Sequence, residues 1–205
     1  MKAVGSVKHE HIVDAAIKRF SHFGISKTTL TEIADDTGIS KTSLFYYFQD
    51  KGNLLEAVGK KIVDESLIEF KTALSPTKSV EEGLLTFIDV KRKFYKKYLL
   101  LAVQSDSAEM NKVAPHLCRV IEEAQEKITS FISDLLKSGI DQSALKKLDV
   151  EKISHLLMET FEAFELSMKS RKALLEIKDI DELFDKQKEV VKMLLNGVKS
   201  SVWKN

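Results

Sequence analysis

Apolar residues recur every three to four positions along most of the chain, which is the spacing of helices that each bury one face. The pattern is clear near the start, where Ile12, Ala16, Phe20 and Phe23 share one side of a helix expected at 8–23. Leu, Lys, Glu, Ala and Ile dominate the remainder, and only two prolines and eight glycines interrupt the chain. The pattern therefore predicts an all-α fold of about nine helices with almost no sheet.

Capping residues place the helix boundaries in the first quarter of the chain. Thr29 and Glu32 have the spacing of a capping box, and Gly38 is suited to end the helix that they open. Ser40 and Asp50 are suited to cap the next two helices. We expect helices at about 8–23, 29–38, 41–48, 51–74, 80–97, 99–111, 115–138, 150–172 and 180–202.

Later boundaries show similar signals. Ser79 and Glu82 have the spacing of a second capping box, and Asp149 is suited to cap the eighth helix. Pro115 is a good first-turn residue, so we expect it to open the seventh helix, and we expect Gly139 to end that helix.

The second and third helices have the features of a helix-turn-helix. Such a pair needs a small residue where the helices touch, which Ala34 supplies, and a turn residue tolerant of positive φ, which Gly38 supplies. Apolar residues must then lock the two helices together, and these are Ile33, Ile39, Leu44 and Phe48. In this geometry the second helix projects from the domain surface and enters the major groove of DNA with its first residues facing the bases.

These residues resemble the signature of the tetracycline-repressor family of bacterial regulators. The resemblance is carried by Thr28-Thr29-Leu30-Thr31-Glu32-Ile33-Ala34, by Gly38-Ile39-Ser40-Lys41-Thr42-Ser43-Leu44-Phe45-Tyr46-Tyr47-Phe48 and by Asp50-Lys51. It extends from Ile12 to Leu55, and its ordered small, turn, apolar and aromatic positions make it specific. It implies a sequence-specific transcription regulator, with repression favoured over activation.

The resemblance assigns roles to the start of the recognition helix. Lys41 and Thr42 correspond to base-edge contacts, and a lysine here suits the O6 and N7 atoms of guanine. Ser43 adds to them. Tyr46 and Tyr47 correspond to positions that contact the DNA backbone, where a phenol hydroxyl can donate to phosphate.

Further phosphate contacts are expected from helix starts. Thr29 and Thr31 offer hydroxyls and backbone amides where the helix dipole favours an anion, and Lys51 does the same from the fourth helix. Two positions depart from the family pattern: Phe45 stands where tyrosine is usual, and Tyr47 where histidine is common. Phe45 cannot donate a hydrogen bond, but it can press on a thymine methyl group.

The family plan divides the chain into a DNA-binding domain at 1–55 and a helical effector-binding and dimerisation domain at 56–205. The last two helices carry apolar stripes, and Phe184 and Val191 widen the stripe of the second. Similar helices in the family pair with their symmetry mates in a four-helix bundle. We therefore expect a homodimer that places two recognition helices about 34 Å apart on a pseudo-palindromic operator.

Aromatic and other large side chains of the middle helices are candidate walls of an effector pocket. They are Phe70, Phe87, Phe94, Tyr98, Met110, His116, Phe131, Phe161 and Phe164. Side chains of this kind at helical spacing are more often plain core, and their apolar character favours a hydrophobic effector. The expected mechanism is that effector binding shifts the fourth helix and so changes the separation of the two recognition helices.

Charge and cysteine content limit the remaining possibilities. The net charge is +1, so DNA binding must come from a local patch and not from a basic surface as a whole. Cys118 is the only cysteine, which excludes an internal disulfide, and we expect it to be buried and inert. No signal peptide and no membrane span is expected, so we place the protein in the cytoplasm.

Two other function classes are alternatives to a regulator. A helical-bundle metalloenzyme would need paired Glu-x-x-His segments or a HExxH run, and the sequence has neither. His155 and Glu159 share a helical face but lack a third ligand, so we expect no metal and no cofactor. A helical adaptor that binds only proteins would leave the capped turn and Lys41 unexplained.

Overall fold

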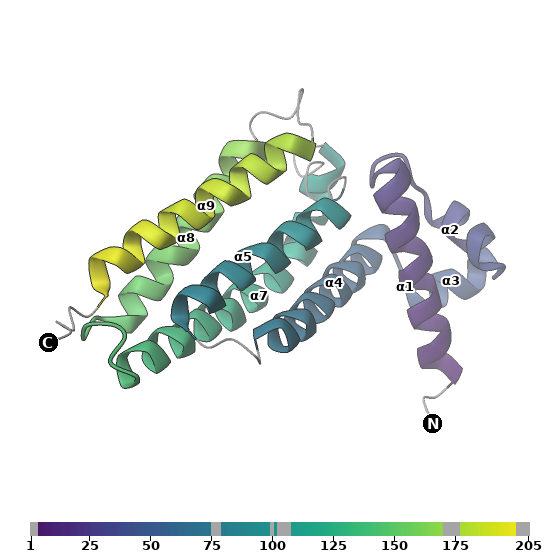
Figure 1. The fold of residues 1–205 in the computed structure, drawn as a ribbon. Helices are drawn as coiled ribbons and strands as arrows, with labels where there is room; N and C mark the ends of the chain where they lie inside the picture. Colours follow the sequence, from purple (N-terminus) through teal and green to yellow (C-terminus); the bar gives the residue numbers. More distant parts are fainter. Residues whose placement is uncertain (1–3, 75–78, 99–100, 102–107, 170–176, 200–205) are drawn as a thin grey trace, which may run out of the picture. The chain divides into compact units, whose positions relative to one another are not determined.

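The computed structural model describes residues 4–74, 79–98, 101, 108–169 and 177–199, and these residues form helices and no strand (Figure 1). The helices are α1 Val4–Phe23, α2 Leu30–Thr37, α3 Lys41–Tyr47, α4 Lys51–Leu74, α5 Val80–Lys97, α7 Ala108–Asp141, α8 Val150–Lys169 and α9 Ile177–Val198. The prediction of an all-α fold is confirmed.

The chain divides into two compact units, each with a core of its own. The first unit comprises Met1–Glu65 and Lys97–Glu123, and the second comprises Ser66–Lys96 and Ala124–Asn205. The chain passes between them inside α4, at the last residue of α5 and inside α7. The functional division at residue 55 stays a prediction.

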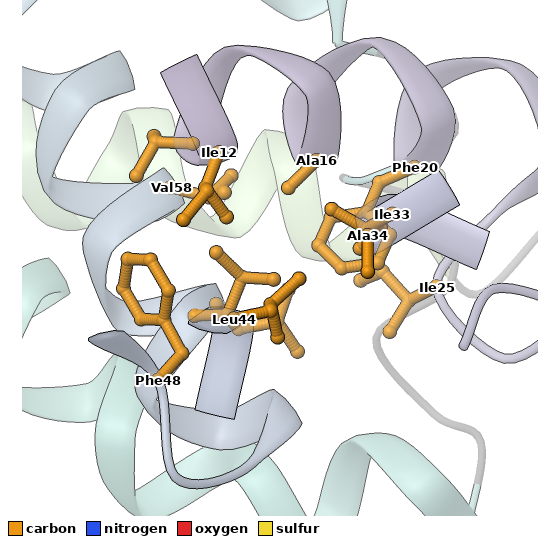
Figure 2. Packing of buried hydrophobic residues seen from close by; sticks show 12 residues of the cluster. Ile12, Ala16, Phe20, Ile25, Ile33, Ala34, Leu44, Phe48 and Val58 are labelled. Carbon is orange, nitrogen blue, oxygen red and sulfur yellow. The ribbon is translucent and has the colours of Figure 1, made fainter. Parts of the chain in front are cut away.

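The core of the first unit is built from one face of each of its first four helices. Figure 2 shows Phe20 of α1, Ile33 and Ala34 of α2, Leu44 of α3 and Val58 of α4 pointing toward one another. All five side chains are almost fully buried. Because α3 has only seven residues, it is too short to persist alone, and this packing holds it in place.

Local caps fix the ends of α2 and α3 as predicted. The Thr29 amide donates to Glu32 Oε2 at 2.7 Å, and the Glu32 amide donates to the Thr29 hydroxyl at 3.3 Å. Gly38 ends α2 in the left-handed region, with φ of 66°. The Ser40 hydroxyl accepts from the Ser43 amide at 3.1 Å and opens α3.

An ion-pair cluster joins α1 to α2. Arg19 of α1 reaches Asp36 Oδ2 at 2.6 Å and Glu32 Oε1 at 2.8 Å. Glu32 therefore accepts from its own helix cap and from α1 at once. The backbone and side-chain bonds from Thr29, followed by the bond from Arg19, lower the pKa of Glu32 from 4.5.

The second unit is a bundle in which α5, α7, α8 and α9 enclose one apolar core, joined by the last turns of α4. Figure 1 shows α8 and α9 side by side. The core includes Phe70, Phe87, Ile88, Ile132, Leu136, Phe161, Ile180, Phe184 and Val191. Ion pairs on the outside join α5 to α9, for example Lys188 to Asp89 at 2.6 Å.

Two predictions about α7 are wrong. Pro115 does not open this helix, which begins at Ala108 and contains the proline. The helix tolerates the lost backbone hydrogen bond because residues beyond the proline are anchored, with Leu117 packed on the first core and Val120 buried. Gly139 does not end the helix either. A Cβ atom there would lie 2.3 Å from Val80, so this glycine permits close packing inside a helix that continues to Asp141.

Cys118 is exposed, not buried, because it lies on the outer face of α7 beside the exposed Arg119. The predicted helix at 99–111 lies mostly outside the described residues, and its last residues belong to α7.

Gly38→Ala is expected to lower the free energy of unfolding by about 1–2 kcal/mol. The added methyl group meets no atom within 4 Å, so the cost comes only from the positive φ. Gly38→Asn is the control, because asparagine adopts this backbone region readily, and it should lose less than half as much. Urea unfolding followed by circular dichroism measures both, and equal losses would contradict the backbone explanation.

Glu32→Gln is expected to flatten the dependence of stability on acid. Because folding lowers the pKa of Glu32, this residue contributes fully to the free energy of unfolding above pH 4.5. The contribution is lost as the pH falls through the pKa of Glu32 in the folded protein. The variant should be less stable than the wild type at neutral pH, and the difference should shrink at about pH 3. Urea unfolding across this range measures it, with the exposed Asp35→Asn as control; an unchanged pH slope in Glu32→Gln would refute the assignment.

Candidate nucleic-acid interface

The outer face of α3 is a compact group of exposed polar and aromatic side chains. Lys41, Thr42, Phe45 and Tyr46 are exposed, and Tyr46 has 84% of its surface accessible. The opposite face of the same helix is anchored by Leu44, which is fully buried. The exposed side chains therefore project from a helix that cannot rotate without breaking the core.

Neighbouring side chains order this face. Lys41 Nζ lies 5.9 Å from the centre of the Phe45 ring, in a cation–π contact one turn along the helix. The Tyr46 and Tyr47 rings meet edge to face, with centres 5.4 Å apart. Tyr47 is half-buried against the core, so it supports Tyr46 from below. Ser43 is half-buried, and its amide is used by the Ser40 cap.

The start of α2 presents a different arrangement. Thr29 and Thr31 are both exposed. The Thr29 hydroxyl donates to Glu32 Oε2 at 2.8 Å and its amide donates to the same atom, so the capping box uses both donors of this residue. Thr31 is thus the better placed of the two to offer a hydroxyl to an anion.

The start of α4 supplies Lys51, which is half-buried. Asp50 opens this helix, and its carboxylate accepts from the Asn53 amide at 2.8 Å as predicted. The helix start therefore places a lysine beside a capped set of backbone amides.

Sequence reasoning missed Arg19 as a residue that positions this surface. Its spacing in α1 fits the helix pattern, but its partner Asp36 lies 17 residues away, beyond any local pattern. By pairing with Glu32 and Asp36, the Arg19 guanidinium offsets two negative charges on α2. His9 of α1 was also missed, and its ring packs 4.7 Å from that of Phe48.

The chemistry of this surface is hydrogen-bond donation and aromatic contact. An ammonium, hydroxyls and a phenol can donate to phosphate oxygens and to acceptors on base edges. Within the described residues, no group of three or more His, Cys, Asp or Glu side chains could hold a metal ion. None of the described helices is long and apolar enough to span a membrane.

The second unit contains a cavity of about 450 Å³, a size that suits a small organic ligand. Three candidate effector residues line it, Phe70, Phe87 and Phe131. The other lining residues are Leu67, Lys71, Glu126, Lys127, Ile128, Ser130 and Asp134. Its lining therefore combines aromatic rings with charges of both signs.

The remaining candidate effector residues do not line this cavity. Phe161 is buried, with its ring 5.9 Å from that of Phe87, while Phe94 and Phe164 are half-buried in the same unit. Tyr98 belongs to the first unit, where its hydroxyl donates to Glu65 Oε2 at 3.2 Å. Met110 and His116 also belong to the first unit, and their side chains lie outside the described part of the chain.

The outer faces of α8 and α9 expose large apolar side chains. These are Leu156 and Leu166 of α8 and Met193 and Leu194 of α9. Phe184 and Val191 do not contribute to this face, contrary to expectation, because both are fully buried in the core of their own unit. The apolar stripe of α9 thus divides into a buried part and an exposed part.

Comparisons with known proteins identify the first unit. A family model described as bacterial regulatory proteins, tetR family, matches residues 12–58. The HTH-type transcriptional regulator RutR of Escherichia coli is 29% identical over 146 residues, which cover 68% of this chain and 69% of that protein. The probable acrEF/envCD operon repressor of Escherichia coli is 25% identical over 115 residues, covering 54% and 52%.

A solved structure matches the whole fold. The transcriptional regulator from Cytophaga hutchinsonii has a TM-score of 0.81 and 26% identity, and the match covers 94% of this chain and 98% of that one. The helix-turn-helix signature, the regulator relatives and the shared fold agree with one another. Residues 12–58 form a DNA-binding domain of the tetR family of bacterial regulatory proteins, and the chain is a DNA-binding transcription regulator.

Proposed function

We propose that this protein is a repressor that binds a pseudo-palindromic operator as a homodimer and leaves it when a small hydrophobic effector binds the second unit. The main support for the DNA contact is Tyr46. This residue has 84% of its surface exposed, and the opposite face of its helix is buried in the core. An aromatic side chain with so much exposed surface lowers the solubility of a protein. Contact with a partner surface rich in phosphate explains why this side chain is exposed.

Each residue of the surface has a separate role in this proposal. Lys41 and Thr42 read base edges, and Phe45 presses on a thymine methyl group or a sugar. Tyr46 donates to a phosphate, with Tyr47 behind it. Ser43 supplements the base contacts, while Thr29, Thr31 and Lys51 hold the flanking backbone, Thr31 from the better placed hydroxyl.

The dimer is proposed to form through α8 and α9. Leu166 is 69% exposed and Met193 is 73% exposed, and apolar side chains of this size cluster on a surface mainly where another protein covers them. A Cβ atom at Gly197 of α9 would meet no atom within 4 Å, so this position leaves space for a second helix to approach closely. A two-fold axis through this face pairs equivalent helices in a four-helix bundle.

The effector is proposed to bind in the cavity at Phe70, Phe87 and Phe131, because these aromatic lining residues favour an apolar ligand. The cavity is also lined by Lys71 of α4, the helix that continues into the first unit. An effector that prefers one arrangement of α4 shifts the dimer between two shapes. Repression is supported by the operon repressor among the relatives.

The proposed role places the protein in the cytoplasm, with the DNA that it binds. It needs no cofactor and no catalytic residue. The regulator relatives favour this role over an enzyme, and the exposed face of α3 favours it over an adaptor that binds only proteins.

Tyr46→Phe is expected to weaken binding to the DNA upstream of the protein's own gene by about tenfold, since it removes one charge-assisted hydrogen bond to phosphate and leaves the ring. Lys41→Ala should also reduce the preference for that DNA over random DNA, since a base contact carries sequence information. Fluorescence anisotropy at several salt concentrations measures both, and wild-type affinity should fall steeply with salt.

Lys137→Ala is the matched control for the loss of one positive charge, because Lys137 is exposed in the second unit. It should leave affinity unchanged. If the protein's own upstream DNA and random DNA bind equally, that target is wrong. If selection from random sequences also finds no preferred site, sequence-specific binding is refuted.

Leu166→Glu and Met193→Glu are each expected to convert the dimer to a monomer at micromolar concentration, because a carboxylate would be buried without a partner. Operator affinity should fall by about a hundredfold or more, since two half-sites can no longer be held together. Sedimentation velocity and anisotropy measure the two effects. Ile68→Glu is the control, as Ile68 is 66% exposed on α4, and it should stay dimeric; a wild-type monomer would refute the proposed dimer.

A further inference from the structure

A polar cluster lies inside the otherwise apolar core of the second unit, where α5, α8 and α9 meet. Phe87, Lys91 and Tyr95 are spaced four residues apart, so they share one face of α5. Phe161 and Glu165 share one face of α8 in the same way. Ring and charge contacts between these residues show that the two faces are in contact.

A shielded ion pair forms the centre of this cluster. Lys91 Nζ lies 2.5 Å from Glu165 Oε1, and the two side chains are only 16% and 22% exposed. A carboxylate oxygen has two lone pairs, so Glu165 Oε1 can accept a further hydrogen bond beside the Lys91 ammonium. Lys91 Nζ also lies 5.4 Å from the centre of the Phe161 ring and 5.7 Å from that of Phe87. The ammonium is thus held by one carboxylate and two rings.

Gln187 of α9 adds a buried acceptor to the cluster. Its side chain is fully buried, and its amide nitrogen donates to the Phe161 carbonyl at a long 3.4 Å. Because that carbonyl can only accept, the amide oxygen points elsewhere, and no described residue donates to it. The other two fully buried polar side chains of the described core, Thr28 and Ser154, both donate to backbone carbonyls at 2.7–2.8 Å.

Tyr95 adds a buried donor. Its hydroxyl has no hydrogen-bond partner in the described part of the chain, and its ring meets that of Phe184 edge to face at 5.8 Å. Burial, and then the nearby charge of Glu165, raise the pKa of Tyr95 to about 12. The hydroxyl therefore keeps its proton at neutral pH and remains able to donate.

Unmatched polar atoms in a core are costly, and apolar side chains of the same shape would pack there without the penalty. Among the buried side-chain atoms without a hydrogen-bond partner in the described residues, those of Tyr95 and Gln187 belong to this cluster, and Glu165 Oε1 has only the Lys91 ammonium. Their concentration at one place points to a partner that supplies the missing hydrogen bonds.

We propose that Lys91, Tyr95, Glu165 and Gln187 form the polar end of the effector site and bind an uncharged group that presents a hydrogen-bond donor beside an acceptor, such as a primary amide. The donor serves the oxygens of Gln187 and Glu165, and the acceptor receives the Tyr95 hydroxyl or a Lys91 proton. This inference rests on the proposed function, in which an effector enters the second unit.

The charge of the cluster selects against ionic ligands. Lys91 and Glu165 cancel each other, so a further buried charge would have no partner. Phe87 joins the cluster to the aromatic cavity, because it lines that cavity and also contacts Lys91. A ligand with an apolar body in the cavity and a neutral polar group beside Phe87 fits both the aromatic cavity and the polar cluster.

Three single-ring probes test the assignment: benzamide, toluene and benzoate, titrated into the full-length protein and followed by ligand-observed NMR. Benzamide should bind about tenfold more tightly than toluene or benzoate, the gain expected for matched hydrogen bonds. Gln187→Met and Tyr95→Phe should each remove this preference and leave toluene binding unchanged. Both variants should unfold at the wild-type temperature or above it, since each removes an unmatched polar atom.

Gln142→Met is the matched control, because Gln142 is exposed, and it should keep the preference for benzamide. Benzamide that binds the wild type no better than toluene overturns the inference, and so does a preference that survives both substitutions. The wild-type comparison decides even if a variant fails to fold. Operator affinity of the wild type, measured without probe, separates the two proposals. If the wild type does not bind an operator, the proposed function is refuted. If it binds an operator but shows no preference for benzamide, only this inference is refuted.

Discussion

The packing of α3 against the first core is the constraint on which the DNA-binding surface depends. A helix of seven residues has too few backbone hydrogen bonds to be stable alone. Its single fully buried side chain, Leu44, contributes roughly 2 kcal/mol by leaving water and also fixes the rotation of the helix. That rotation determines which residues face outward, so the exposure of Lys41 and Tyr46 is a consequence of burying Leu44.

Electrostatics act locally in this protein. The chain carries a net charge of only +1, so no general field draws it to DNA, and individual charges near α2 and α3 matter more. Arg19 is important for this reason. It ties α1 to α2 and at the same time pairs with Glu32 and Asp36, two carboxylates that would otherwise oppose phosphate.

The second unit uses the same helix packing but keeps features that a purely structural core would lack. Its outer face on α8 and α9 exposes apolar side chains, and its interior holds polar atoms that the described residues do not match. Both features reduce the stability of an isolated unit. Natural proteins keep such features where a partner or a ligand compensates for them, and this is the physical basis for proposing a dimer and an effector site in this unit.

The sequence by itself determined the features that depend on neighbours along the chain. The Thr29 capping box and the turn at Gly38 involve contacts within a few residues, and helical periodicity identified Ile12, Ala16 and Phe20 as the buried face of α1. Tertiary structure decided what depends on distant partners. Gly139 packs so closely on Val80 that no side chain would fit, Arg19 pairs with Asp36 on another helix, and the surroundings of Gln187 come from three helices. No local pattern contains these contacts, because they form only when separate helices pack together.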